Sequence, residues 1–505
     1  MSILRGTCLA LLLTLLLVGA LAVAPNRGRA QSSNPHDPTW WDKFTYIAKN
    51  GPLGSGGSTS SLTFGSNVDI SNECGPQSET FIAINSAQTK NIAAGSNEIF
   101  RLPMRGYFST DGGKNWGGVD LPLPPPIGTN GIDFGSDPSL AFDARGSLFY
   151  SYIVVFFSNG AGTSINGTEM AVARSTDGGK TYPGVTYFGF EGGENHFNDK
   201  PMITTDRNAS SRFRDNIYVA WDAASGGSTG GGVRVAASSD HGATFSITRA
   251  DDPTGPGRSI GASPAVGPGG ELYVAWNDYA QNVIAFNRSF DGGKTWDTQR
   301  TISTKNAPFD VGIPAESFRR ALVYPSLGVD TSTGPHRGRL YCSWMDLTPS
   351  SITDIFISYS DDKGASWSAP QPVTDRGYFA DRFNHWMSVD PTTGDVNVAF
   401  YDTRFDTTGF RYMTDYLLTQ SKDGGATFSP NIRVSNQSSN EHDCDGVFPC
   451  AGINYGNQQG DYEGLASYGG TSYPVWTDSR RQLAQSSGCR GGLAMEEVFT
   501  AKVIP

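Results

Sequence analysis

The chain has 505 residues, of which only 17% are charged, and it contains 62 glycines and 29 prolines. This length allows several domains or one large all-β domain, and the glycines and prolines suit a fold with many turns. The formal net charge is −11 without any basic block. This disfavours nucleic acid and anionic membrane surfaces as partners.

The N-terminus has the pattern of a targeting segment. Arg5 precedes an apolar run over residues 9–24, and the small-residue sequence Gly28-Arg29-Ala30 follows. This pattern predicts a secretory signal peptide over residues 1–30, with an uncleaved signal anchor as the alternative. The run is short for a membrane span. We therefore expect a secreted, periplasmic or extracellular protein that keeps no membrane span after removal of the signal.

Residues 31–66 are rich in Ser, Gly and Pro, which predicts a linker or a loosely held arm. The repeated part of the chain follows, from about residue 67 to residue 505, and we expect it to form one domain.

A short pattern, Ser-x-Asp-x-Gly-x-x-aromatic, occurs six times in this domain and predicts a repeat architecture. It suits a hairpin turn, because the Ser and Asp side chains can bond backbone N–H groups and the Gly accepts a positive φ. The four defined positions of the successive copies are Ser109, Asp111, Gly113, Trp116; Ser175, Asp177, Gly179, Tyr182; Ser238, Asp240, Gly242, Phe245; Ser289, Asp291, Gly293, Trp296; Ser360, Asp362, Gly364, Trp367; and Ser421, Asp423, Gly425, Phe428.

This pattern resembles the Asp box, or BNR repeat, of the sialidase superfamily. The resemblance covers almost the whole chain after residue 67. It implies a β-propeller in which the Asp boxes are structural turns on the face opposite the active site.

A second repeat runs in phase with the boxes and gives the number of blades. Each unit has a strand that often ends in Trp-x-Asp, as in residues 216–222, and seven such strands can be counted. The last unit lacks a fourth strand, and residues 67–72 resemble the fourth strand at residues 431–436. We therefore predict an all-β fold consisting of a single propeller of four-stranded blades, with an N-terminal strand completing the last blade. Seven blades are favoured, and six, the usual number in sialidases, is the alternative.

Five cysteines remain after removal of the signal, and export permits disulfides. Cys444 and Cys450 lie close together in one loop and are the first predicted pair. Cys74 and Cys489 lie near opposite ends of the domain. A disulfide between them would hold the propeller ring closed. Cys342 occupies a strand position that is Val in sister strands, so we expect it to be buried and free.

Two sets of polar residues are expected to meet on one face of the propeller. In each blade the innermost strand begins at this face, and the loop after the second strand returns to the same face. The set after second strands includes Asp402 with Arg404 and Asp478 with Arg480. The set before innermost strands includes Asp137, Asp199, Arg382, His385, Trp386, Asp461, Tyr462 and Glu463. One interpretation is a cup for a carbohydrate; the other is that recurring Asp residues complete turns or bridge blades.

The resemblance also implies roles for these residues. Sialidases hold the substrate carboxylate with three arginines and use a Tyr nucleophile assisted by a Glu, with an Asp as acid/base. On this basis Arg382, Arg404 and Arg480 would form the clamp, Tyr462 and Glu463 the nucleophile pair, and Asp137 or Asp199 the acid. The family's arginine motif has a counterpart at residues 100–103, but nearer to the first Asp box than in sialidases.

The sequence thus predicts a secreted glycoside hydrolase of the sialidase kind, acting on terminal sugars of a glycan without a cofactor. A propeller that binds a glycan or protein without turnover, or a structural envelope protein, is the alternative. No metal site is predicted, although the acidic segment 441–445 would suit calcium. The sequence does not specify the sugar or the oligomeric state.

Overall fold

The computed structural model describes residues 61–71, 77–98, 103–124, 134–158, 164–193, 197–223, 230–255, 257–316, 319–375, 378–441, 459–480 and 496–505. The predicted signal peptide, the arginine motif at residues 100–103 for the most part, and Cys74, Cys444, Cys450 and Cys489 lie outside these ranges. Cys342 is buried and free, as predicted. In the described part of the chain, no helix is long and apolar enough to cross a membrane.

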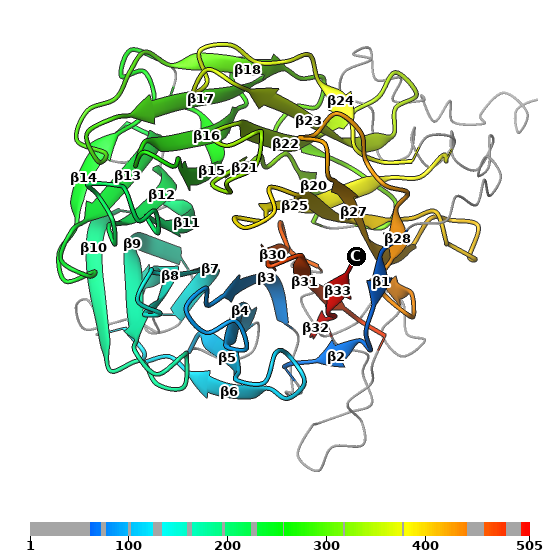
Figure 1. Ribbon diagram of the computed structural model, residues 1–505, viewed down its shortest axis with the longest axis horizontal. Coiled ribbons are helices and arrows are strands. Elements are labelled where there is room, and N and C mark those ends of the chain that lie inside the picture. Colours follow the sequence, from blue (N-terminus) through cyan, green and yellow to red (C-terminus); the bar gives the residue numbers. More distant parts are fainter. Residues whose placement is uncertain are drawn as a thin grey trace, which may run out of the picture.

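The described residues form antiparallel sheets arranged as a ring, which we number as blades 1 to 7 (Figure 1). Blade 1 contains β3 (Gln77–Ile84), β4 (Ile92–Glu98), β5 (Arg105–Ser109) and β6 (Gly117–Asp120). Blade 2 contains β7 (Phe134–Phe142), β8 (Leu148–Ser158), β9 (Ser164–Ser175) and β10 (Gly184–Gly192). Blade 3 contains β11 (Asp199–Thr205), β12 (Ile217–Ala223), β13 (Gly232–Ser238) and β14 (Ser246–Arg249). Blade 4 contains β15 (Ser259–Val266), β16 (Leu272–Asp278), β17 (Val283–Ser289) and β18 (Arg300–Thr304).

Blade 5 contains β21 (Ser326–Val329), β22 (Leu340–Leu347), β23 (Thr353–Ser360) and β24 (Gln371–Pro372). Blade 6 contains β25 (Arg382–Val389), β26 (Val396–Asp402), β27 (Met413–Ser421) and β28 (Ile432–Arg433), and β29 (Ser439–Asn440) also pairs with β27. Blade 7 contains β30 (Gly464–Tyr468), β31 (Thr471–Asp478) and β32 (Glu497–Thr500), with β33 (Val503–Ile504) beside β31. A separate hairpin, β19 (Asp310–Val311) with β20 (Ala321–Leu322), lies between blades 4 and 5. The prediction of an all-β propeller with seven four-stranded blades is confirmed, and the six-blade alternative is wrong.

The second strand of each blade forms its most buried layer. Strands β12, β16, β22 and β26 are buried along their whole length, because neighbouring blades cover both of their faces. Trp276, Trp344 and Trp476 from such strands are among the largest fully buried side chains. The core is therefore distributed between the blades around the ring, and no blade has an apolar core of its own.

The last blade is completed by an N-terminal strand, as predicted. β2 (Val68–Asp69) pairs antiparallel with β32 through Val68 with Thr500 and Asp69 with Phe499. The hydroxyl of Ser71 donates to Glu497 Oε2 (2.7 Å) and accepts from Val498 N (2.9 Å). These bonds extend the contact between the N-terminal segment and β32. A second strand, β1 (Thr63–Phe64), pairs with β33 and lies within the segment predicted as a linker.

The Asp boxes form the turns between the third and fourth strands of blades 1 to 6. In the fifth box the Ser360 hydroxyl accepts a hydrogen bond from Gly364 N (2.8 Å), and Asp362 Oδ1 accepts one from Ser366 N (2.8 Å). The Gly at the fifth position of the pattern has a φ between 80° and 95° in all six boxes, which favours glycine.

Each box also accepts a hydrogen bond from the preceding blade. Thr186 donates to Gly242 O (2.6 Å) and Thr248 to Gly293 O (2.8 Å). The corresponding donors for the other boxes are Tyr473 to Gly112, Asn91 to Gly178, Arg288 to Lys363 and Gln371 to Gly425. The boxes therefore link consecutive blades on what we call the Asp-box face; the opposite face is the upper face.

Candidate functional site

The innermost strands place polar side chains at the upper end of the central channel by means of β-bulges. The pairing register shifts in β3, β7, β11, β15 and β25. In each bulge one residue has a positive φ, and these residues are Glu79 (52°), Asp137 (60°), Lys200 (49°), Gly261 (74°) and Asn384 (43°). Positive φ is uncommon for residues other than Gly, and a bulge re-aims the side chain that it carries. This repeated distortion brings residues of different blades together around the axis.

Three carboxyl groups from blades 1 to 3 form a hydrogen-bonded chain. Asp137 shares hydrogen bonds with Glu79 on one side and Asp199 on the other. The amide of Asn97 supports the chain by donating to Glu79 Oε2 (2.5 Å) and accepting from Asp137 N (2.7 Å). Glu79 and Asp137 are buried, whereas Asp199 is only half-buried. Asp199 is thus the member of the chain that reaches toward solvent.

The environments of these three groups separate their pKa values. Burial, followed by the charge of Asp137, raises the pKa of Asp199 and of Glu79 well above their ordinary values. Burial would also raise the pKa of Asp137, but the hydrogen bonds from Glu79, Asp199 and Ser136 outweigh it and lower that pKa. These opposite shifts make Asp137 the most acidic member of the chain. Such a separation is typical of carboxyl groups that act as acid and base in catalysis.

A fourth carboxylate, Asp461, approaches this chain from blade 7. Arg319 donates to Asp461 Oδ1 through Nε (2.6 Å) and to Glu79 Oε1 through Nη2 (2.8 Å). The hydroxyl of Tyr324 donates to Asp461 Oδ2 (3.1 Å). Only 12% of the Asp461 side chain is exposed, so it is fixed in place yet accessible. We call Glu79, Asp137, Asp199 and Asp461 the acidic cluster.

Lys200 lies beneath the acidic cluster in a cage of aromatic rings. Its Nζ lies 3.5 Å from the ring centre of Tyr324, 4.1 Å from that of Tyr462 and 5.3 Å from that of Trp386. Burial lowers the pKa of Lys200 to about 7, although the charges of Asp461 and Glu79 oppose this. Cation–π contacts replace the water that the ammonium group loses. The cage closes the floor of the site.

The structure does not bring Tyr462 and Glu463 together as a nucleophile pair. The Tyr462 hydroxyl donates to Pro138 O (3.0 Å), and its ring belongs to the Lys200 cage. Glu463 instead accepts from the hydroxyl of Tyr401 (2.6 Å) and from Thr477 N (3.0 Å) between blades 6 and 7. These two neighbouring side chains thus contact different parts of the protein.

The three arginines predicted as a carboxylate clamp are bound to carboxylates of the protein itself. Arg382 and Arg404 both bind Asp402, at 2.9 Å and 2.7 Å. Arg480 binds Asp478 and also donates to Asn67 Oδ1 (3.0 Å) beside the N-terminal strand. These pairs favour a structural interpretation of the Trp-x-Asp carboxylates.

Two other predicted residues lie in the floor or walls of the channel. His385 is buried and its Nε2 lies 2.9 Å from the Ser343 hydroxyl of blade 5. Burial lowers its pKa to about 3, which keeps the ring neutral. Trp386 packs edge-on against Phe81, with ring centres 5.3 Å apart. Neither side chain is presented as an open platform for a sugar ring.

Sequence reasoning missed Arg319 and Glu316, which come from the connection between blades 4 and 5. Glu316 is buried, and the charges of Glu441 and Asp461 add to burial in raising its pKa well above the ordinary value. One signal was available, because the Asp boxes beginning at Ser289 and Ser360 are farther apart than any other consecutive pair. The extra residues there include the β19–β20 hairpin and Arg319.

Solved structures are similar to this chain only at low sequence identity. No family model matches the sequence, and no curated relative matches it. Among solved structures the chain is similar to a leech intramolecular trans-sialidase (13% identity, TM-score 0.46), covering 73% of this chain and 70% of that one. It is also similar to an α-L-arabinofuranosidase of Fusarium graminearum (13%, 0.45; 74% and 98% covered) and to a Dyadobacter fermentans protein of unknown function (12%, 0.45; 88% and 99%). The identities are too low to transfer the role of any residue.

Proposed function

We propose that this protein is a secreted glycoside hydrolase that removes a terminal sugar from a glycan at the acidic cluster on its upper face. The observation that carries the proposal is the hydrogen-bonded chain Glu79–Asp137–Asp199, in which neighbouring carboxyl groups have pKa values shifted in opposite directions. Glycoside hydrolysis requires one protonated and one ionised carboxyl group at the scissile bond.

We assign Asp199 as the general acid. Burial and the charge of Asp137 raise its pKa, which favours the protonated form, and its half-buried position leaves it accessible. Asp199 would donate its proton to the glycosidic oxygen as the bond to the sugar breaks. Asp137 would remain ionised beside it and hold Asp199 in orientation.

Asp461 is our candidate for the second carboxylate of the reaction. Arg319 and Tyr324 fix its two oxygens, so that it could stabilise the positive charge on the sugar or accept a proton from water. Asp137 is too close to Asp199 for this role, because catalytic carboxyl groups of glycosidases lie about 5–9 Å apart and these two share a hydrogen bond. Tyr462 and Glu463 point in different directions. We therefore assign Tyr462 to the floor of the site and Glu463 to its wall.

The charge of the site favours a neutral sugar over a carboxylated one. The acidic cluster has four carboxyl groups, two of which have raised pKa values, and Arg319 is already bound to Glu79 and Asp461. Among the described residues, Arg382, Arg404 and Arg480 are likewise occupied by Asp402 and Asp478. A sialoside would bring a further negative charge, and these four described arginines are already engaged by carboxylates of the protein.

A panel of fluorogenic glycosides, with neutral pentosides, hexosides and a sialoside, tests the proposal on the chain starting at Gln31. We expect release from a neutral sugar, with activity falling on the alkaline side as Asp199 loses its proton. Asp199→Asn should lower kcat by about 100-fold or more, whereas Asp120→Asn on the outer strand β6 should leave it unchanged.

Two results would contradict parts of the proposal. Full activity of the Asp199→Asn variant would remove Asp199 from the reaction. No release from any glycoside by a protein shown to be folded would favour the alternative, a propeller that binds a glycan or protein without turnover. A glycan array would then be the next measurement.

A further inference from the structure

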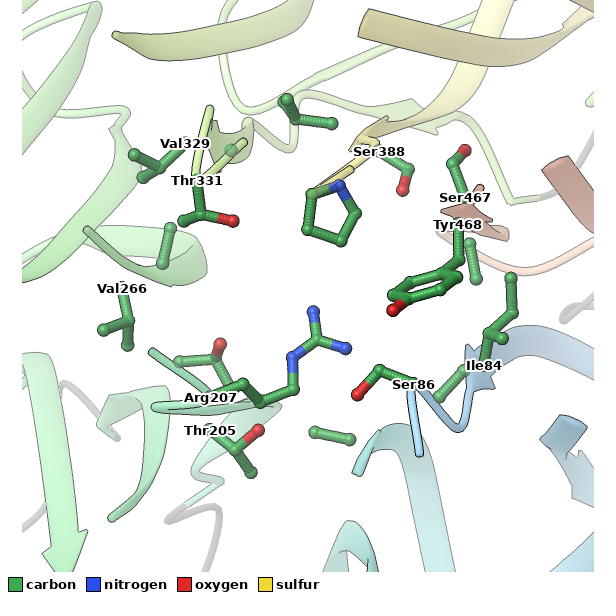
Figure 2. Close-up of a pocket in the computed structure, with 18 of the residues that line it drawn as sticks. Ile84, Ser86, Thr205, Arg207, Val266, Val329, Thr331, Ser388, Ser467 and Tyr468 are labelled. Carbon is green, nitrogen blue, oxygen red and sulfur yellow. The ribbon is translucent and has the colours of Figure 1, made fainter. Parts of the chain in front are cut away.

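A second hollow opens at the other end of the central channel, on the Asp-box face. It has a volume of about 590 Å³ and is lined by the ends of the innermost strands and the turns that follow them. Its walls combine polar groups with apolar side chains, and Ile84, Val266, Val329 and Val389 are among the apolar ones. Figure 2 shows this cavity, with Arg207 and Tyr468 projecting into it from opposite sides. The volume is within the range of sites that hold small organic ligands.

The charge of this cavity is opposite to that of the protein. Among the described residues that line it, Arg207 and Arg337 are the charged ones, and there is no Asp or Glu. The whole chain, by contrast, has a formal net charge of −11. The hydroxyl groups of Ser86, Thr331 and Tyr468 add hydrogen-bond donors. An anion would thus meet positive charge and donors here, without a competing carboxylate.

Arg207 is not neutralised by the acidic residue next to it. Asp206 Oδ1 accepts from the backbone and side-chain nitrogens of Asn208 (both 3.0 Å), and Asp206 Oδ2 accepts from the Ser211 hydroxyl (2.5 Å). In the described part of the chain the guanidinium of Arg207 has no hydrogen bond or ion pair, and the residue is exposed within the hollow. Within the described ranges, Arg337 donates to the backbone carbonyls of Thr331 and Ser332.

Arg207 also departs from the repeat. It is the second residue after its innermost strand, and at the corresponding place blades 1, 4, 5 and 6 have Ser86, Pro268, Thr331 and Pro391. A charged residue is therefore not needed to close this turn. Its presence in one blade alone is more consistent with a ligand contact than with a role in the fold.

We propose that this cavity binds a small organic anion, a carboxylate or a phosphate monoester with a compact apolar body. The guanidinium of Arg207 binds the anionic group in a bidentate manner, with the Tyr468 hydroxyl donating from across the cavity. Arg337 adds positive charge at the rim, and the valine and isoleucine side chains contact the apolar body. The site is independent of the proposed hydrolytic site, which lies on the upper face.

Isothermal titration calorimetry with benzoate, phenyl phosphate, inorganic phosphate and the neutral analogue benzyl alcohol tests the proposal on the chain from Gln31. We expect saturable binding of benzoate or phenyl phosphate. Comparison of these two titrations shows whether the cavity prefers a carboxylate or a phosphate group. Benzyl alcohol should not bind, and inorganic phosphate should bind more weakly than phenyl phosphate because it lacks the apolar body.

The matched variants are Arg207→Met and Arg145→Met. Arg145 lies in the corresponding turn of blade 2, is paired with Asp215 and does not line the cavity. Arg207→Met should weaken anion binding by about tenfold or more, and Arg145→Met should bind as the unchanged protein does. Equal binding by both variants, or no binding of any anion at millimolar concentration by the folded protein, would overturn the proposal. Neither result would bear on glycoside hydrolysis.

Discussion

Glu463 illustrates how a buried carboxyl group makes stability depend on pH. It is fully buried, and it contacts the hydroxyls of Thr80 and Tyr401 and the backbone of Thr477. Burial raises its pKa from 4.5 to about 8, although these hydrogen bonds oppose the shift. Glu463 is therefore protonated in the folded protein at neutral pH, while it would ionise in the unfolded chain.

We predict that Glu463→Gln makes the stability less dependent on pH. Between pH 4.5 and 8 the folded state retains a proton that the unfolded state releases, so the free energy of unfolding falls as pH rises through this window. The loss is about 1.4 kcal/mol for each pH unit. Glutamine keeps the shape without titrating and should remove this part of the slope.

Thermal unfolding followed by circular dichroism between pH 4.5 and 9 measures this effect. Asp120→Asn, at the surface, is the control and should keep the slope of the unchanged protein. A Glu463→Gln variant with that same slope would show that Glu463 does not retain its proton.

The acidic cluster could be predicted from the sequence only in part. Asp137, Asp199 and Asp461 were found because strand order alone places their positions on one face. Their partner Arg319 was not found, because it comes from an insertion outside the repeat. The contact of Glu463 with Tyr401, outside the cluster, was missed because it depends on side-chain direction. Ion pairs such as that of Arg404 with Asp402 (2.7 Å) also depend on the final packing of the blades.

Among the elements, the Asp boxes were the most predictable, because their structure is local. Nearly all contacts inside a box lie within five residues, such as those of Asp362 with Ser360 and Ser366. The bulges of the innermost strands were not predicted. Glu79, Asp137 and Lys200 are three different residue types, and positive φ is uncommon for each of them.

We predict that Asp362→Ala destabilises the fold more than Asp361→Ala, although the two residues are neighbours in one box. Asp362 Oδ1 accepts from Ser366 N, and Oδ2 accepts from the Ser366 hydroxyl. Loss of these bonds should cost about 1–3 kcal/mol. Asp361 makes a surface ion pair with Arg339 and its side chain is 60% exposed, so its removal should cost no more than about 1 kcal/mol.

Urea unfolding of the two variants checks this prediction, since a lower midpoint with an unchanged slope reports a change in stability. The difference should also shrink in strong acid, because hydrogen bonds to Asp362 hold its pKa at about 2 against the effect of burial. The stability that this carboxylate adds is present above its unfolded pKa and is lost as pH falls through 2. Equal midpoints for the two variants at neutral pH would show that the box is dispensable.

At the scale of the whole molecule, the ring is closed by a strand from the far end of the chain. Counting the repeated units gave seven blades, and the incomplete last unit indicated where the missing strand had to come from. The prediction succeeded because a propeller with an unpaired outer strand would expose a sheet edge. β1, by contrast, was not predicted, since its two residues carry no strand pattern.

We predict that a chain beginning at residue 73 melts at a lower temperature and that a peptide of residues 61–72, added in trans, restores part of the loss. Binding to the folded state alone stabilises it in proportion to the logarithm of peptide concentration. A peptide with Ile70→Pro is the matched control, because it lacks the N–H that Ile70 donates to Val498 O (2.8 Å). Equal effects of the two peptides would show that β2 is not bound as a strand.

The pairing of β2 with β32 also affects how the protein can fold during synthesis. Ser71 and Val498, which are hydrogen-bonded next to this pairing, are 427 residues apart. A ribosome that adds about 5–20 residues per second needs roughly 20–90 s to make the second after the first. During that interval β2 has no partner, and the earlier blades can pack only on one another. The propeller ring can therefore close only when synthesis is nearly complete. In a nascent chain stalled before residue 497, β2 would remain unpaired and the ring would remain open.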